Sequence, residues 1–392
     1  MRDTVRRRVS FSLRRLIPMR LELTPLECSA LFPILRQAQK ISRNVSNHRT
    51  FRDEAKLVAN GSTVTLMVTD LESAILVPLC SAQDMGEWSI KLEPLLKFVA
   101  FGKAAPLTIE VGETITLRVG SSTGSAIGNS PAADWPMWPL ATQVPATVLG
   151  AATYLGAKLR EELSYVLPAA ARELGRFAMN GVCFDVLDQK IQLVATDGRR
   201  CAMAALATTL EELPKSTVLE RLPAQILAAL PGSVISMRWL QGQLGSLLTF
   251  EAEGWTLCAR AVEGDFPRYR AVTSMPASRC TTVQVRAAEL LSVLDGLLPG
   301  IDEKKKDFVT HTICNGDVRL VTKSSEGHVT RVRPGGDVTF ALRADFFRDA
   351  VKAHGKEVDE ISIEVVDGKS PVRLMNPLEP SRCYVVMPVV SE

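Results

Sequence analysis

The chain has 392 residues, more than a single hydrophobic core usually supports, so we expect two or three domains. Its hydrophobic fraction of 46% and charged fraction of 23% are ordinary for a soluble globular protein, and we find no apolar run of about 18 residues that would indicate a membrane span. The net charge of +3 is too small to indicate a class of partner by itself.

The first 19 residues are basic, with six arginines and a single acid, Asp3. Their apolar residues are too often interrupted by arginine for a secretory signal. We therefore interpret residues 1–18 as a basic N-terminal extension or the product of an upstream start codon. A tail that contacts DNA phosphate stays open as an alternative.

Helical and strand-like patterns follow one another along the rest of the chain. Plausible caps, N-terminal prolines and following glycines or prolines mark the helices. The predicted helices are Pro25–Lys40, Leu92–Phe101, Thr153–Tyr165, Pro223–Leu230, Ala287–Leu298 and Arg343–His354. Alternating runs such as Leu107–Val119 and Ser362–Leu374 predict strands. Pairs of helices among many short antiparallel strands indicate an α+β fold rather than a doubly wound sheet.

An internal repeat organises these elements. Three segments each combine a turn with a run of apolar residues at every second position, as in a hairpin with one buried face. These segments are Ala59–Asp70, Leu187–Asp197 and Cys314–Lys323. Their spacing is roughly one ordinary domain length, which favours three similar domains.

A second marker recurs at nearly the same interval. Ala133–Pro136 closes one unit, Gly264–Pro267 closes the next, and the last unit ends with Arg382–Pro388. Because both markers share one spacing, we expect domain boundaries near residues 146 and 277. The predicted domains are residues 19–146, 147–277 and 278–392.

The cysteines are scattered singly, without any Cys-x-x-Cys pair. This spacing supports neither a zinc site nor a disulfide framework, so we expect no metal. Isolated cysteines usually lie in cores as small hydrophobic residues, which fits a reducing cytoplasm. The eight cysteines are at positions 28, 80, 183, 201, 258, 280, 314 and 383.

Motifs of catalysis are weak. The four histidines lack metal-ligand spacing, and neither a phosphate-binding glycine loop nor a nucleophile elbow is present. Asp70 and Asp197 occupy equivalent positions in two repeats, which would allow a pair of catalytic carboxylates. We favour the alternative that each aspartate caps the turn after its strand. The sequence thus predicts a protein that is not an enzyme and needs no cofactor.

Several segments resemble bacterial DNA polymerase III beta subunits, the beta sliding clamps. Arg176–Val182 and Leu193–Arg200 resemble the middle domain of that family, and Gly264–Arg270 resembles its end. Pro131–Pro136 and Tyr384–Pro388 resemble the ends of the first and last domains. The resemblance spans residues 19–392 in order and includes the threefold repeat.

The resemblance implies a particular fold and function. The expected fold is three tandem clamp domains, each with two helices backed by antiparallel sheet, and two chains meeting head to tail in a ring. The expected function is a DNA polymerase processivity factor, a sliding clamp of DNA replication. Its partners would be double-stranded DNA, and a polymerase and clamp loader that bind through short peptide motifs. The alternatives are a divergent clamp paralogue for a specialised or repair polymerase and an enzyme on the repeat scaffold.

A clamp must hold DNA of any sequence, so its contacts should be to phosphate. For the basic residues a solvated helix face is an equal alternative, and for Phe177 so is core packing. The candidate DNA-binding residues are Lys40, Arg43, Arg49, Lys97, Lys103, Lys158, Arg160, Arg176, Phe177, Arg348 and Lys352.

The resemblance also implies a groove between the middle and last domains that accepts short partner segments. It would be rich in methionine and valine, which suits several different peptides. The matched positions are Met179, Thr196, Gly198, Arg199, Cys201, Pro267, Val272, Phe346, Val385, Met387, Pro388 and Val389.

This sequence departs from the family pattern at and near the groove. Arg199 stands where the family often has histidine, Cys201 where leucine is usual, and Ala271 where arginine is common. At the expected ring closure, Ser125 replaces a large apolar residue. The preferred peptide and the strength of the dimer are therefore open.

Overall fold

The computed structural model describes most of the chain. The described residues are 19–46, 51–81, 83–135, 147–172, 177–187, 190–211, 216–242, 245–274, 279–300, 309–314, 317–322, 325–333, 336–354 and 358–389. The chain divides into two compact units, Met1–Trp138 (unit 1) and Pro139–Glu392 (unit 2). Across the described residues, no helix has the length and apolar character needed to cross a membrane.

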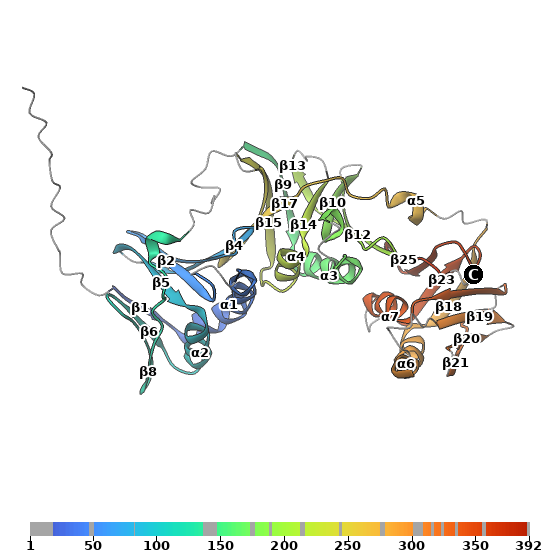
Figure 1. Ribbon diagram of the computed structural model, residues 1–392, viewed down its shortest axis with the longest axis horizontal. Helices are drawn as coiled ribbons and strands as arrows, with labels where there is room; N and C mark the ends of the chain where they lie inside the picture. The colour runs from blue at the N-terminus through green and yellow to red at the C-terminus, as the bar shows by residue number, and fades with distance from the viewer. Residues whose placement is uncertain are drawn as a thin grey trace, which may run out of the picture. The chain divides into compact units, whose positions relative to one another are not determined.

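Unit 1 contains the first repeat, with two four-stranded antiparallel sheets ordered β1-β6-β7-β8 and β5-β2-β3-β4. Helices α1 and α2 pack against each other (Figure 1). The elements are β1 (Met19–Leu23), α1 (Pro25–Asn44), β2 (Glu54–Asn60), β3 (Thr63–Thr69), β4 (Ser73–Ser81), β5 (Met85–Lys91), α2 (Leu92–Gly102), β6 (Leu107–Val111), β7 (Ile115–Val119), β8 (Ser122–Ser125) and the 3-10 turn η1 (Ala132–Asp134).

Helix α1 shows why these residues become helical. The Thr24 hydroxyl accepts from the Glu27 backbone N–H at 3.3 Å, and the Glu27 carboxylate accepts from the Thr24 N–H at 2.7 Å. These two bonds form a capping box, with Pro25 at the first helical position. Hydrogen bonds from the Thr24 backbone and hydroxyl hold the pKa of Glu27 below its usual value. Residues Leu31, Leu35 and Ala38 are buried at helical spacing.

Unit 2 begins with the second repeat, whose sheets follow the order β9-β15-β16-β17 and β14-β10-β11-β12. Helices α3 and α4 pack together as α1 and α2 do (Figure 1). The elements are β9 (Thr147–Leu155), α3 (Gly156–Val166), η2 (Leu167–Ala169), η3 (Phe177–Met179), β10 (Gly181–Leu187), β11 (Lys190–Thr196), β12 (Arg200–Leu206), β13 (Thr209–Glu211), β14 (Thr217–Glu220), α4 (Arg221–Leu227), β15 (Val234–Gly242), β16 (Gly245–Ala252), β17 (Trp255–Val262) and α5 (Arg270–Thr273).

The third repeat completes unit 2 with the orders β18-β23-β24-β25 and β22-β19-β20-β21. Its helices α6 and α7 also pack together. The elements are β18 (Thr281–Arg286), α6 (Ala287–Leu297), η5 (Leu298–Gly300), β19 (Val309–Cys314), β20 (Asp317–Val321), β21 (Glu326–Thr330), β22 (Val338–Leu342), α7 (Ala344–Ala353), β23 (Glu360–Val365), β24 (Val372–Asn376) and β25 (Glu379–Val386).

The three repeats thus share one strand order, and the predicted α+β fold of three tandem units is confirmed. Local details differ from the sequence prediction. Helix α3 begins at Gly156 rather than Thr153, because the residues before it complete strand β9. The run Leu107–Val119 forms the two strands β6 and β7, and the short helix α5 was not predicted.

Candidate functional site

The second and third repeats are joined by strand pairing between β12 and β25 (the junction). The pairing is antiparallel and matches Cys201 with Val385 and Met203 with Cys383. Because side chains alternate along a strand, these residues share one face of the sheet, and Tyr384 points to the other face. The two faces of the junction have different characters.

On the face of Tyr384, the junction carries buried charges. Arg382 is 5% exposed and Glu162, on α3, is 1% exposed. The Arg382 guanidinium donates to Glu162 at 2.7 Å, to Glu379 at 2.8 Å and also to Glu161. Burial lowers the pKa of Arg382, but the bonds and charges of Glu162 and Glu161 outweigh it and raise that pKa. A buried charge that is paired in this way ties α3 to β25.

The same face contains a buried histidine. His354 follows α7 and is 3% exposed, with its ring 5.3 Å from the ring of Tyr165. Burial, followed by the positive charge of Arg382, lowers the pKa of His354 to about 4. The histidine is therefore neutral at pH 7 and acts as an interior aromatic residue.

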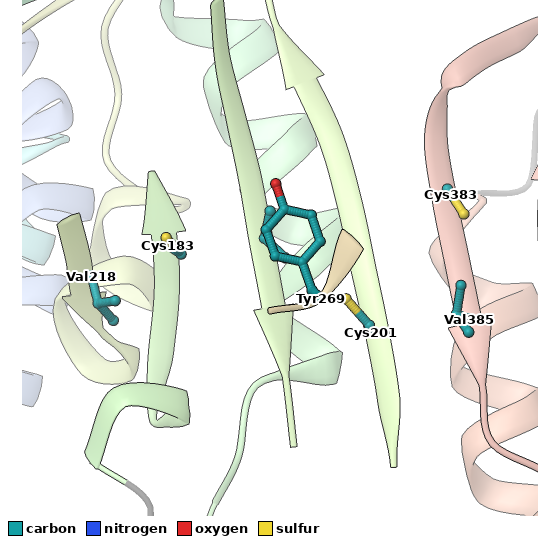
Figure 2. Packing of buried hydrophobic residues seen from close by; sticks show 7 residues of the cluster. Cys183, Cys201, Val218, Tyr269, Cys383 and Val385 are labelled. Atoms are coloured by element: carbon teal, nitrogen blue, oxygen red, sulfur yellow. The ribbon is translucent and has the colours of Figure 1, made fainter. Parts of the chain in front are cut away.

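On the opposite face, the junction forms an apolar cavity of about 170 Å³, which we call the groove. Figure 2 shows the buried cluster beneath it, with Cys201 and Val385 on adjacent strands and Tyr269 over the sheet. The groove is lined by Thr196, Gly198, Arg199, Arg200, Cys201, Pro267, Arg268, Tyr269, Val272, Val385 and Met387.

Buried and exposed residues divide the groove into a floor and a rim. Cys201 is 3% exposed and Val385 is 1% exposed, so they form an apolar floor. Met387 at 36% and Val272 at 38% are unusually exposed for apolar residues. Burial raises the pKa of the Cys201 thiol, which therefore stays protonated and serves as a small hydrophobic residue.

Eight of the twelve residues that the sequence predicts for the groove line this one cavity. They are Thr196, Gly198, Arg199, Cys201, Pro267, Val272, Val385 and Met387. Phe346 lines a neighbouring cavity, Met179 lies in η3, and Pro388 and Val389 follow β25 directly. The prediction missed Arg200, Arg268 and Tyr269, although all three lie inside the segments that carry the family resemblance.

A tight turn shapes one side of the groove. The Thr196 hydroxyl donates to the Arg200 carbonyl at 2.6 Å and accepts from the Gly198 N–H at 3.1 Å. The Asp197 carboxylate accepts the N–H groups of Arg199 and Arg200 at 2.9 and 3.0 Å. Gly198 has φ 84°, a conformation that glycine adopts without strain. The prediction that Asp197 caps a turn is therefore confirmed.

A segment that we call the strap, Gly264–Ser274, supplies the opposite side of the groove through Pro267 and Val272. Asp185, which is 7% exposed on β10, fixes the strap. Its carboxylate accepts the Tyr269 hydroxyl and an Arg270 guanidinium N–H, each at 2.5 Å. Burial, together with Asp185, raises the pKa of Tyr269, so the phenol stays protonated and donates.

A polar cavity of about 510 Å³ lies beside the groove, and both cavities are lined by Arg199 and Arg200. The guanidinium groups of Arg200 and Arg343 each lie 4.2 Å from the centre of the Phe346 ring. Cation–π contacts of this kind hold the arginines in fixed positions. The polar cavity is lined by Ala170, Ala171, Arg172, Asp197, Arg199, Arg200, Arg343, Asp345, Phe346 and Asp349.

Most of the candidate DNA-binding cations already contact other parts of their own unit. Lys97 pairs with Glu93 at 2.8 Å, Arg43 with Asp53 at 3.6 Å and Arg348 with Asp295 at 2.5 Å. Lys103 lies 3.6 Å above the Phe32 ring, Lys158 pairs with Glu162 at 2.7 Å, and Arg160 donates to the Gly232 carbonyl at 2.8 Å. The ion pairs of Arg43, Lys97 and Arg348 are exposed and exchange readily with solvent, so these contacts leave the DNA prediction open.

The remaining described cations among the candidates, Lys40 on α1 and Lys352 on α7, are also exposed. Arg49 and Arg176 lie outside the described residues, and for Phe177 the structure describes the backbone alone, as the first residue of η3. A role in DNA binding therefore stays a prediction for each of them.

Comparison with known proteins gives one consistent result. No family model matches the chain. A beta sliding clamp of Proteus mirabilis is 23% identical over 376 residues, covering 91% of this chain and 97% of the relative. The beta sliding clamp of Escherichia coli strain K12 is 24% identical over 395 residues, with the same coverage of both chains.

Solved structures extend the likeness. The DNA polymerase III beta subunit of Thermotoga maritima superposes with a TM-score of 0.80 at 21% identity, covering 95% of this chain and all of that one. A sliding clamp from Bartonella birtlesii, solved bound to griselimycin, gives a TM-score of 0.80 at 18% identity over 95% of this chain.

The fold is therefore that of a DNA sliding clamp, with three repeats in a single chain. Its likeness is to the bacterial DNA polymerase III beta subunit, the beta sliding clamp, and extends over nearly the whole chain. The resemblance predicted from the sequence is confirmed.

Proposed function

We propose that this protein is a DNA polymerase processivity factor: a non-catalytic sliding clamp that encircles duplex DNA and tethers replication or repair proteins. The observation that carries the proposal is the likeness to beta sliding clamps along almost the full length of both chains, with all three repeats present in order. We place the domain boundaries as the sequence predicts them, near residues 146 and 277.

Ring formation is supported by the way in which the repeats join. At the junction, the last strand of one repeat's sheet, β25, pairs with strand β12 of the preceding repeat. The equivalent strands at the two ends of the series are β8 and β21, and among the described residues each has a sheet neighbour on one side only. Pairing of β8 with β21 of a second chain would repeat the junction. A contact of this head-to-tail kind closes into a ring.

Retention on DNA would come from the ring and not from strong binding. The charges of the helices are mixed, since α6 carries Glu289 and Asp295 without any lysine or arginine. Phosphate contacts from the remaining cations are independent of sequence and weakened by salt, so they permit sliding. Leaving a closed circle of DNA would then require opening the protein ring.

The groove would hold the protein's partners. Its apolar floor and exposed rim match the general pattern of a site for short segments with apolar anchor residues. We assign it to peptide segments of a DNA polymerase and of a clamp loader. The seven cysteines whose side chains are described are free thiols, which supports a cytoplasmic location.

The ring is tested by measuring the lifetime of labelled protein on circular and linear duplexes after loading. We expect retention on the circle through a wash in high salt, and release when a nuclease cuts the circle once. Equal rates of loss from both duplexes would exclude topological retention. Sedimentation at micromolar concentration should show a dimer, whereas monomers alone would contradict self-closure.

The groove is tested by replacing Met387, at its exposed rim, with aspartate. A polymerase-derived peptide should lose at least tenfold in affinity, because a carboxylate would have to be desolvated beside the apolar floor. The matched control is Leu378→Asp, since Leu378 is 90% exposed in the β24–β25 turn and does not line the groove. Unchanged binding by the Met387 variant would refute the assignment.

A further inference from the structure

The strap borders two hollows on one face of the sheet. Its residues Pro267, Arg268 and Tyr269 line the groove of about 170 Å³ and also a second cavity of about 1230 Å³, which we call the strap cavity. The groove lies over Cys201 and the strap cavity over Cys183, with the Tyr269 ring between them (Figure 2). The strap cavity therefore gives the strap room to move away from the groove.

The backbone hydrogen bonds of the strap join residues that are close in sequence. The Tyr269 N–H donates to the Pro267 carbonyl at 2.7 Å. The N–H groups of Val272 and Thr273 donate to the Tyr269 carbonyl at 3.0 and 3.2 Å. These bonds hold the strap together as one unit and do not connect its backbone to the sheet below.

Side chains tie this unit to the two repeats that it joins. On the second repeat, the Asp185 carboxylate accepts the Tyr269 hydroxyl and an Arg270 N–H, each at 2.5 Å. On the third repeat, the Arg373 guanidinium donates to the Thr273 carbonyl at 3.3 Å. Short hydrogen bonds to a charged acceptor are the stronger kind, so Asp185 is the main tether of the strap.

The first repeat holds its equivalent segment, which ends at Trp135, in a different way. Its buried carboxylate is Glu54, which accepts the backbone N–H groups of Asn129 and Ser130 at 2.6 and 3.2 Å. A tether to the backbone fixes the chain itself. The tethers of the strap end instead on the Tyr269 side chain and the Arg270 side chain, whose rotatable bonds let the strap backbone shift.

We propose that the strap is a movable wall of the groove, and that Asp185 is the positioning residue that sets the size of apolar anchor the groove accepts. This inference rests on the proposed function, because the anchor belongs to a partner segment. An oversized side chain is disfavoured in a firmly packed apolar site. To enter, it must push Pro267 and Val272 toward the strap cavity against the bonds to Asp185. A weaker tether should therefore lower the penalty for a large anchor.

The test uses three versions of the polymerase-derived peptide that differ only in the apolar anchor, which is leucine, phenylalanine or tryptophan. Affinities for the full chain are measured by fluorescence anisotropy. The parent protein should bind the leucine version about tenfold tighter than the tryptophan version, with phenylalanine between them. This ratio of affinities is the quantity to follow, because a general loss of stability would change all three affinities alike.

Two variants weaken the tether by different amounts. Tyr269→Phe keeps the ring and removes the hydroxyl, which contacts Asp185 and, at 3.1 Å, Gln192. It should lower the ratio to about threefold. Asp185→Ala removes both tethers and should bring the ratio below about twofold. The Arg270 side chain is 51% exposed and can be hydrated in that variant. Should Asp185→Ala fail to fold, Tyr269→Phe alone decides.

The matched control is Glu54→Ala, which removes the buried carboxylate of the first repeat and should keep the ratio of the parent. Hydrogen exchange gives a second measurement of the strap itself. In Asp185→Ala, the amide protons of Val272 and Thr273 should exchange faster than in the parent. Those of β23 in the third repeat should exchange as before, because the release is local.

The outcomes separate this inference from the proposed function. If Asp185→Ala keeps the ratio of the parent, or if the parent binds all three versions equally, the movable wall is wrong. The groove still stands in that case, provided that Met387→Asp abolishes binding. If Glu54→Ala lowers the ratio as far as Asp185→Ala, general destabilisation replaces the tether. If the parent binds none of the peptides, the proposed groove fails, and this inference fails with it.

Discussion

The turn Thr69–Ser73 of the first repeat and the turn Thr196–Arg200 of the second have the same hydrogen bonds. In each, the threonine hydroxyl donates to the carbonyl of the fifth residue, at 2.9 and 2.6 Å. In each, the aspartate caps the N–H groups that follow it. The turns differ in what they contact outside themselves.

The difference comes from the fifth residue. In the first turn it is Ser73, which donates to Asp70 at 3.0 Å, while the other oxygen of Asp70 accepts from Asn44 on α1. In the second turn it is Arg200, which reaches Asp349 on α7 of the third repeat. The long side chain of Arg200 thus makes the second turn part of the junction between the repeats, where the groove forms.

The largest expected effect is a loss of stability in acid, which His354 at the junction would cause. His354 has a pKa of about 4 in the folded chain, against 6.5 for an ordinary histidine. Between pH 6.5 and pH 4, His354 is protonated in the unfolded chain but stays neutral in the folded chain. The stability that neutral His354 contributes is thus complete above pH 6.5 and falls by about 3 kcal/mol as the pH approaches 4.

Urea unfolding of the full chain at pH 7 and pH 4 measures this loss, with His354→Leu as the reference. The leucine variant keeps an apolar side chain beside Tyr165 and has no proton to bind. Its unfolding free energy should therefore fall less on acidification than that of the parent. An equal fall in the unfolding free energy of both proteins would show that His354 does not make the chain sensitive to acid.

The next effect compares how much Arg200 and Ser73, the fifth residues of the two turns, contribute to stability. Arg200→Met removes a guanidinium that is 5% exposed and leaves Asp197 and Asp349 without it. Because Asp349 is partly exposed and can be hydrated, we expect a loss of about 2 kcal/mol rather than the full cost of an unpaired buried charge. Ser73→Ala in the first turn should cost about 1 kcal/mol, the value of a modest hydrogen bond. If urea unfolding gives similar losses of free energy for Arg200→Met and Ser73→Ala, the two turns contribute equally to stability and the proposed difference between them is wrong.

A smaller effect concerns the third residue of the second turn. Gly198 has φ 84°, where a Cβ atom costs about 1–2 kcal/mol. Gly198→Ala should lower the stability of the chain by that amount. Since Gly198 also lines the groove, peptide affinity should fall as well. Binding is measured by anisotropy and stability by urea unfolding, and an unchanged stability would contradict the strain argument.

The sequence predicted the repeated architecture well, because alternation and turn residues are local signals. It also placed eight groove residues, since these lie in segments with a clear family resemblance. It could not predict that Arg382 would bind Glu162, which lies 220 residues earlier. It also missed Arg200 as a groove residue, because one of the two acids that hold the buried guanidinium, Asp349, lies 149 residues later in the chain.

The strap is a second case in which the sequence could not predict a contact between residues far apart in the chain. Its residues Pro267 and Val272 were predicted, but the group that holds them is Asp185, on a strand that carries no motif of its own. The burial of Asp185 beside the Tyr269 hydroxyl and the Arg270 guanidinium depends on the folded sheet and leaves no periodic pattern in the sequence. Helix α3 was misplaced by three residues, because strand β9 continues to the first helical turn and no capping residue marks the change.

The smallest effect tests the strain in the first turn. Leu71, the counterpart of Gly198, has φ 83° and carries a side chain there. Glycine is ordinarily the less stabilising choice relative to alanine, because it loses more backbone entropy on folding. At positive φ the order reverses, so Leu71→Gly should be more stable than Leu71→Ala by about 1 kcal/mol. Both variants lose the same leucine contacts, and the difference between their urea midpoints therefore reports the backbone alone. An alanine variant that is the more stable of the two would show that the paired turns do not share their conformation in solution.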